Sequence, residues 1–153
     1  MTTDINRVYT TRRLAIVDAL TEKLKEINGT GEFNTDVYDN VHPRLKFWDE
    51  VDQFPALHLN AGAETREYQS AGYKDRFLSV TIRIYVKEED SVVALEGLIE
   101  DVETIIEKYS ALPYLDKRGN SQKTHQITIV SINTDEGVLD PLGVGEVLLE
   151  VRY

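Results

Sequence analysis

The clearest pattern in the chain is a strict alternation of apolar and polar residues between positions 77 and 86. The apolar residues at every second position are Leu78, Val80, Ile82, Ile84 and Val86, and their neighbours are polar or amphipathic. Alternate side chains of a β-strand point to opposite faces of the sheet, so this period of two predicts a strand with one buried face.

A helical period begins directly after the charged residues 87–90. Between positions 91 and 109 one stripe collects the apolar residues Val92, Leu95, Leu98, Ile99, Val102, Ile105, Ile106 and Tyr109. This spacing predicts an amphipathic helix with one buried side. A long half-buried strand followed by such a helix is typical of a two-layer α+β domain. Because neither element carries an obvious catalytic group, we expect function on the edges and loops.

Another helix is predicted from about residue 4 to residue 28. Thr3 or Asp4 can cap its start, and Asn28-Gly29 supplies the left-handed residue that ends many helices. The remaining pattern predicts strands at residues 32–38, 54–60, 124–134 and 145–153, the last of which ties the C-terminus into the sheet.

The predicted order is therefore α-β-β-β-α-β-β, an α+β fold in which two helices pack on one face of a mixed or antiparallel sheet of four to five strands. The expected core sets the sheet residues Leu57, Leu59, Leu78, Val80, Ile82, Ile84, Val147, Leu149 and Val151 against the helix residues Leu95, Leu98, Val102 and Ile105. We expect residues 1–153 to form a single domain, since the length allows one core but not two.

The polar connection at residues 61–75 is too long for a tight turn, so it predicts either an extended hairpin arm or a flexible loop. Tyr68 and Tyr73 lie in it with no core to bury them, which favours a protein contact. Arg66, Gln69 and Lys74 flank them and join the candidate contact residues. A second polar connection covers residues 110–123.

Three arginines, Arg7, Arg12 and Arg13, lie near the start of the first predicted helix, where positive charge opposes the helix dipole. They form either a solvated surface or a contact with an acidic neighbouring subunit. By contrast, Tyr9, Tyr109 and Tyr153 are expected to be core or half-buried residues.

The charge balance argues against a surface that grips nucleic acid. The chain has 17 Lys and Arg against 27 Asp and Glu, a formal net charge of -10, whereas phosphate contacts need a basic patch. Acidity is compatible with a channel through which DNA slides without sticking. Cysteine is absent, and no segment resembles a signal peptide or a membrane span, so we expect a protein that is made and assembled in a cytoplasm.

No residue pattern indicates catalysis, a cofactor or a metal. The histidines His42, His58 and His125 lack ligand spacing, and Asp49, Glu50 and Asp52 lack the glycine and spacing of a calcium loop. There is neither a Gly-x-Ser-x-Gly sequence nor a phosphate-binding loop ahead of a helix. The sequence therefore predicts that the protein is not an enzyme.

The arrangement resembles the tail terminator, or tail completion, proteins of long-tailed bacteriophages, of which the lambdoid minor tail protein U is the best-known type. The likeness covers nearly the whole chain. It includes the sequence Arg-Arg-Leu-Ala-Ile-Val-Asp-Ala-Leu at 12–20, Phe-Pro-Ala-Leu at 54–57, the long strand and helix of residues 77–109, and the closing Gly-Glu-Val-Leu-Leu-Glu-Val-Arg-Tyr at 145–153.

The resemblance implies a structural virion protein that forms a ring, usually of six subunits, on the last ring of the tail tube. Such a ring stops polymerisation of the major tail tube protein and offers its other face to the head-completion or connector protein. DNA would only pass through the lumen, to which we assign the acidic residues Asp49, Glu50, Asp52 and Glu136. The alternatives are another phage neck or head-completion protein, or a small ligand-binding α+β domain with a pocket between sheet and helices.

Overall fold

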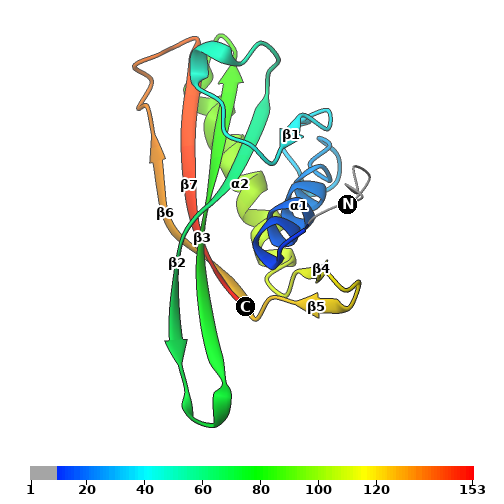
Figure 1. The fold of residues 1–153 in the computed structure, drawn as a ribbon. Coiled ribbons are helices and arrows are strands. Elements are labelled where there is room, and N and C mark those ends of the chain that lie inside the picture. The colour runs from blue at the N-terminus through cyan, green and yellow to red at the C-terminus, as the bar shows by residue number, and fades with distance from the viewer. Residues whose placement is uncertain (1–9) are drawn as a thin grey trace, which may run out of the picture.

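Five strands form one mixed β-sheet, in the order β1-β2-β3-β7-β6, in the computed structural model, which describes residues 10–153 (Figure 1). The strands are β1 (Val41–His42), β2 (Ala56–Tyr68), β3 (Lys74–Lys87), β6 (Gln126–Thr134) and β7 (Leu142–Arg152). β1 runs parallel to β2, and every other pairing in this sheet is antiparallel. The predicted α+β fold is confirmed.

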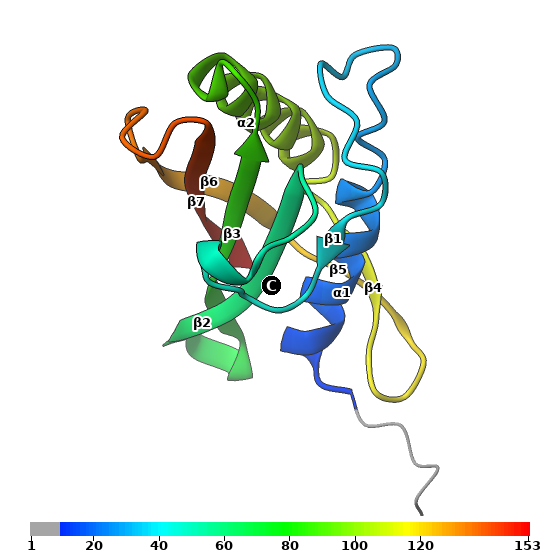
Figure 2. The ribbon, with the colours of Figure 1, turned by 90° about the horizontal axis from the view of Figure 1, so that it is seen from above.

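Both helices, α1 (Arg12–Leu24) and α2 (Ser91–Lys108), lie on the same side of the sheet, as predicted (Figure 2). The predicted helix over residues 4–28 is wrong at residues 10, 11 and 25–28, which are not helical. Thr11 has an extended backbone and its side chain accepts the N–H of Leu14, so it is the N-cap. Thr3 and Asp4 lie outside the described residues. In residues 10–153, neither helix is long and apolar enough to cross a membrane.

The predicted strand at residues 32–38 is also wrong, because the backbone N–H groups there bond to side chains and to nearby carbonyls rather than to a neighbouring strand. The carboxylate of Asp101 on α2 accepts the N–H groups of Asn34 and Thr35, each at 2.8 Å. A single isolated bridge joins Asn28 to Asp36. The short first strand, β1, instead begins at Val41, after the predicted range.

The polar connection at residues 110–123 contains a small two-stranded sheet that the sequence pattern did not predict. It consists of β4 (Pro113–Leu115) and β5 (Ser121–Lys123). Tyr114 on β4 is buried, and its hydroxyl accepts hydrogen bonds from the Arg12 guanidinium at 2.9 and 3.1 Å. The small sheet is thereby attached to the start of α1.

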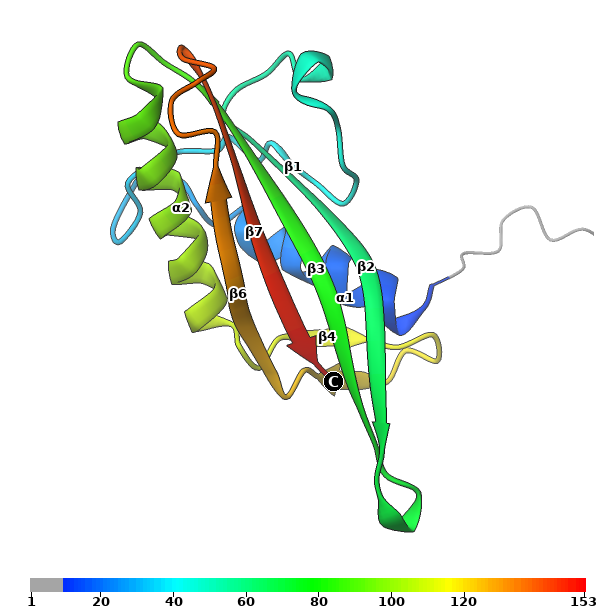
Figure 3. The ribbon, with the colours of Figure 1, turned by 90° about the vertical axis from the view of Figure 1, so that its left-hand side faces the viewer.

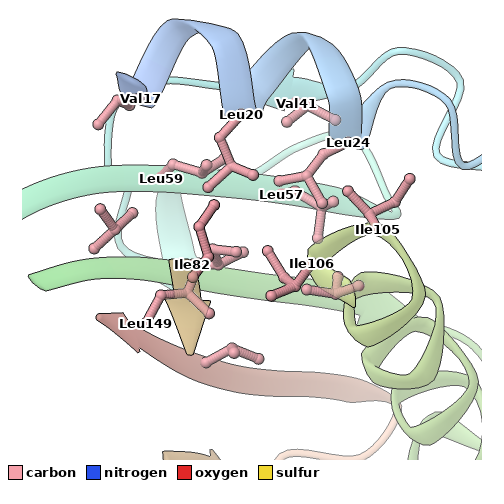
Figure 4. Packing of buried hydrophobic residues seen from close by; sticks show 14 of the residues in the cluster. Val17, Leu20, Leu24, Val41, Leu57, Leu59, Ile82, Ile105, Ile106 and Leu149 are labelled. Carbon is pink, nitrogen blue, oxygen red and sulfur yellow. The ribbon is translucent and has the colours of Figure 1, made fainter. Parts of the chain in front are cut away.

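The core lies between the sheet and the two helices (Figure 4). Every residue of the expected core is buried. Gly145 on β7 lets α2 approach closely, because a Cβ there would lie 3.0 Å from Leu95 Cδ1. Burial of this apolar surface is the main stabilising term, at about 1.5–3 kcal/mol for each large aliphatic side chain.

The other face of the sheet is open along most of its length but covered at one end. A loop that includes the short helix η1 (Trp48–Glu50) lies over it there, on the side away from α2 (Figure 2). The hydroxyl of Tyr85 donates to the carbonyl of Lys46, and the His58 ring bonds to the carbonyl of Arg44. At this end the long strand is therefore buried on both faces, whereas the alternation had predicted one.

Candidate functional site: the hairpin arm

The strands β2 and β3 continue past the rest of the sheet as a two-stranded arm (Figures 1 and 3). The last row that reaches β7 pairs Phe77 with Arg152, whereas β2 and β3 stay paired as far as Tyr68 and Lys74. The short helix η2 (Ser70–Gly72) closes the tip. Of the two predicted possibilities for residues 61–75, the structure therefore shows the extended hairpin arm.

Exposed tyrosines and cations gather at the end of the arm. The side chains of Tyr68 and Tyr73 are 71% and 74% exposed, and the Lys74 ammonium lies 5.4 Å from the centre of the Tyr68 ring. Residues that face each other across an antiparallel pair share a side, so Arg66, Tyr68 and Lys74 lie together on one side. The arm therefore holds five of the predicted contact residues, namely Arg66, Tyr68, Gln69, Tyr73 and Lys74.

The last residue of the chain anchors the base of the arm. Tyr153 exchanges backbone hydrogen bonds with Arg76, and its hydroxyl donates to the carboxylate of Glu64. The guanidinium groups of Arg12 and Arg76 lie 5.0 and 5.4 Å from the centre of the Tyr153 ring. Arg66 donates to the other oxygen of Glu64 at 2.6 Å. Three distant segments therefore meet where the arm leaves the sheet.

This anchor shifts the pKa of two of its members. Burial would raise the pKa of Glu64, but the hydrogen bonds from Tyr153 and Arg66 outweigh it, so the pKa is lowered. Burial, and then the hydrogen bond to the Glu64 carboxylate, raise the pKa of Tyr153 to about 12. Near neutral pH the pair is therefore a phenol bound to a carboxylate, a charge-assisted hydrogen bond.

The arginines of α1 make contacts within the chain. Arg12 binds Tyr114 and lies over the Tyr153 ring, and Arg13 donates to the carbonyl of Gly62 on β2. These bonds attach the start of α1 to the base of the arm. Arg7 lies outside the described residues. The predicted contact of Arg12 and Arg13 with a neighbouring subunit stays a prediction.

The acidic residues assigned to the lumen lie at the end of the sheet opposite the arm tip. Asp49, Glu50 and Asp52 are exposed in the loop that crosses the open face, and Glu136 is exposed in the β6–β7 turn. The structure thus brings the first three together and leaves Glu136 in a separate loop. Sequence reasoning overlooked the exposed Phe47 beside them, which is 66% exposed.

Two further features, a pair of histidines and a surface groove beside α2, lie away from the arm tip. The rings of His42 and His58 are 5.2 Å apart, but both bond to protein oxygens. Within residues 10–153 no three His, Asp or Glu side chains are grouped to hold a metal. A surface groove of about 890 Å³ lies between α2 and the segment 34–38, and its lining is mostly acidic and polar, including Glu96, Glu100 and Glu103.

Comparisons with known proteins agree with the resemblance drawn from the sequence. The chain is 30% identical over 149 residues to the tail tube terminator protein p142 of Escherichia phage T5, with 92% of each chain covered. Its fold matches a chain in the virion of a native gene transfer agent particle, with a TM-score of 0.54, 10% identity, and 90% and 93% of the two chains covered.

A family model described as bacteriophage tail tube terminator protein matches residues 10–153. This match covers all of the chain that the structure describes, and it sets aside the alternative of a small ligand-binding domain. The narrower likeness to the lambdoid protein U stays a prediction. The chain belongs to the bacteriophage tail tube terminator protein family, whose members are structural proteins of the virion tail and not enzymes.

Proposed function

We propose that copies of this chain form a closed ring, with six subunits expected, on the end of the tail tube. The ring stops further addition of the major tail tube protein and presents its other face to the head-completion or connector protein. The observation that carries the proposal is the hairpin arm, which projects beyond the sheet and ends in exposed aromatic and cationic side chains. Aromatic residues and arginine are enriched at protein interfaces.

The arm is the part of the ring that contacts the tube. Beyond Phe77, residues 10–153 add only the backbone pairing of Tyr153 with Arg76, so the side chains near the tip are available on both sides. Tyr68 and Tyr73 offer large contact areas with little rotamer entropy to lose. The anchor around Tyr153 holds the base of the arm to the sheet, which lowers the ordering cost of binding.

The open face of the sheet turns toward the lumen, through which DNA passes. The helices occupy the opposite face, and the loop with Asp49, Glu50 and Asp52 crosses the open one. An acidic wall repels phosphate, so DNA is not retained. A continuous basic lumen in a structure of the assembled ring would contradict this orientation.

The decisive experiment shortens the arm between Arg66 and Lys74 by replacing residues 67–73 with a two-residue turn, which keeps the bond from Arg66 to Glu64. No core side chain is removed, so the unfolding temperature should change little. In an infected cell, tails should grow beyond their normal length or fail to join heads, and the variant should be absent from purified tails. Tails of normal length that carry the shortened variant would show that another surface makes the contact.

Point variants separate side-chain contacts from arm length. The double variant Tyr68→Ala and Tyr73→Ala should bind tail tubes at least tenfold more weakly, since truncating a tyrosine that is a hot spot of an interface costs about 2 kcal/mol or more. The matched control is Tyr38→Ala, because Tyr38 is 76% exposed but lies in the loop before β1. Binding can be measured by cosedimentation with purified tubes. Equal weakening by both variants would contradict a specific role for the arm.

A further inference from the structure

The strand β6 forms an outer edge of the sheet that lacks the usual protection. Its nine residues, Gln126–Thr134, include neither a charged residue nor a proline. Edge strands of proteins that stay apart are commonly short or carry charges or proline. Val130, which lies at a bulge, is 56% exposed, and Ile132 is 38% exposed. This edge therefore presents apolar side chains beside a backbone that can pair.

The opposite edge of the sheet has a complementary hollow. β1 covers only Leu57 and His58 of β2, so β2 has no neighbour on that side from Leu59 onward among the described residues. A groove of about 240 Å³ opens just beyond β1, beside Asn60 and Ala61. Its other walls are α1 and Pro43, and Leu14 on α1 is 53% exposed there.

The exposed residues and the groove lie at the same level of the sheet. Ser131 on β6 pairs with Leu148, Leu148 with Thr81, and Thr81 with Asn60 on β2. One row of paired residues thus runs from the bulge at Val130 to the edge of the groove. The subunits of a ring are related by rotation, and a rotation about an axis along the strands does not shift one copy along that axis. The bulge of one copy and the groove of its neighbour would therefore lie at the same position along the strands and would meet.

The two edges also agree in side and direction. Ile132 pairs with the buried Val147, so it lies on the helix side of the sheet, where α1 and the groove lie. The four long strands alternate in direction, so β2 and β6 of one copy run in opposite directions. A rotated copy keeps its directions, and its β2 would therefore meet β6 as an antiparallel partner.

We propose that the subunits of the ring join head to tail through these edges, with β6 of one copy pairing with β2 of the next. Val130 and Ile132 then pack against Leu14 and the groove beside it. The proposal rests on the ring of the proposed function and assigns its subunit contact. A heterologous contact of this kind generates a ring when its rotation closes.

Disulfide trapping tests the contact directly, because the chain has no cysteine of its own. The double variant Leu14→Cys with Val130→Cys, assembled on tails and then oxidised, should give a ladder of covalent multimers on a non-reducing gel. The single variants should give dimers at most. The control pair Leu14→Cys with Val138→Cys should give no ladder, since Val138 is 82% exposed but lies in the β6–β7 turn.

A charge variant provides the second measurement. Val130→Lys should abolish the ring on tails seen by electron microscopy, whereas Val138→Lys should retain it, and both should keep the unfolding temperature of the parent. If Val130→Lys still forms rings, or if the Leu14→Cys with Val130→Cys variant forms rings that give no covalent ladder, the edge contact is wrong, although the proposed ring is not affected. If the parent chain itself forms no ring on tails, the proposed ring fails, and the edge contact fails with it.

Discussion

Removing one hydroxyl group tests whether the C-terminal residue anchors the arm. In the variant Tyr153→Phe the ring and its contacts remain, but the Glu64 carboxylate loses a donor. That side chain is only 6% exposed, and Tyr153 is 4% exposed, so water replaces the lost bond poorly. A hydrogen bond to a charged group contributes about 1.5–3 kcal/mol. For a protein of this size, a loss of about 2 kcal/mol lowers the unfolding temperature by about 4–8 °C.

The pH dependence gives this prediction a sharper form. The folded-state pKa of Glu64 is lowered, so its contribution is present above its ordinary value of 4.5 and is lost as pH falls through the lowered pKa. Tyr153 has a raised pKa of about 12, so its contribution is present below its ordinary value of 10.0 and is lost as pH rises toward 12. The stability difference between parent and variant should therefore be largest near neutral pH and shrink at both extremes.

Two assays check the result. Thermal unfolding followed by circular dichroism gives the stability difference across pH. Hydrogen exchange should show faster exchange in residues 62–68 of the variant, because the base of the arm opens more easily. The control is Tyr73→Phe, whose exposed hydroxyl should matter little. Equal unfolding temperatures and equal exchange in Tyr153→Phe and the parent would refute the anchor.

Three further predictions concern the core and the loop that α2 holds. Ile82→Ala should lower the free energy of unfolding by about 2–5 kcal/mol and Val102→Ala by about 1–4 kcal/mol, because both side chains are fully buried. Denaturant titration measures this free energy, and an unchanged value in both variants would contradict the assigned core. Gly143→Ala should lower the free energy of unfolding by about 1–3 kcal/mol, since the new Cβ would lie 2.7 Å from a methyl group of β3 and 3.1 Å from a backbone carbonyl of α2. The control Gly62→Ala should change thermal unfolding little, because the nearest atom to its Cβ, the carbonyl oxygen of Ser79, would be 3.8 Å away. Burial raises the pKa of Asp101, so the folded state should lose stability as pH rises through that pKa, and Asp101→Ala should lack this pH dependence of stability. Asp101→Ala should also lower the free energy of unfolding by about 1–3 kcal/mol near pH 7, because the N–H groups of Asn34 and Thr35 lose their acceptor.

Local periodicity by itself determined the two central elements. The alternation at residues 77–86 lies within β3, and the helical stripe at residues 91–109 matches α2 within one residue. Each signal is local, because the side chains of a strand or helix point in directions set by their own backbone. The core residues followed from the same patterns, and so did the exposed position of Tyr68 and Tyr73.

Tertiary structure decided the features that depend on distant partners. The segment 32–38 is not a strand because Asp101, more than sixty positions away, accepts its N–H groups. β1 forms where β2 offers an edge, although two residues are too short a run to predict a strand by their pattern.

The same reason governs the candidate site. The sequence predicted which residues lie in the arm, but the anchor joins Arg12, Glu64 and Tyr153, which no spacing in the sequence relates. The relation between the β6 edge and the groove at β2 likewise depends on the pairing of four strands. Local residue patterns specify faces and periods, whereas the meeting of remote segments is set only when the whole chain packs.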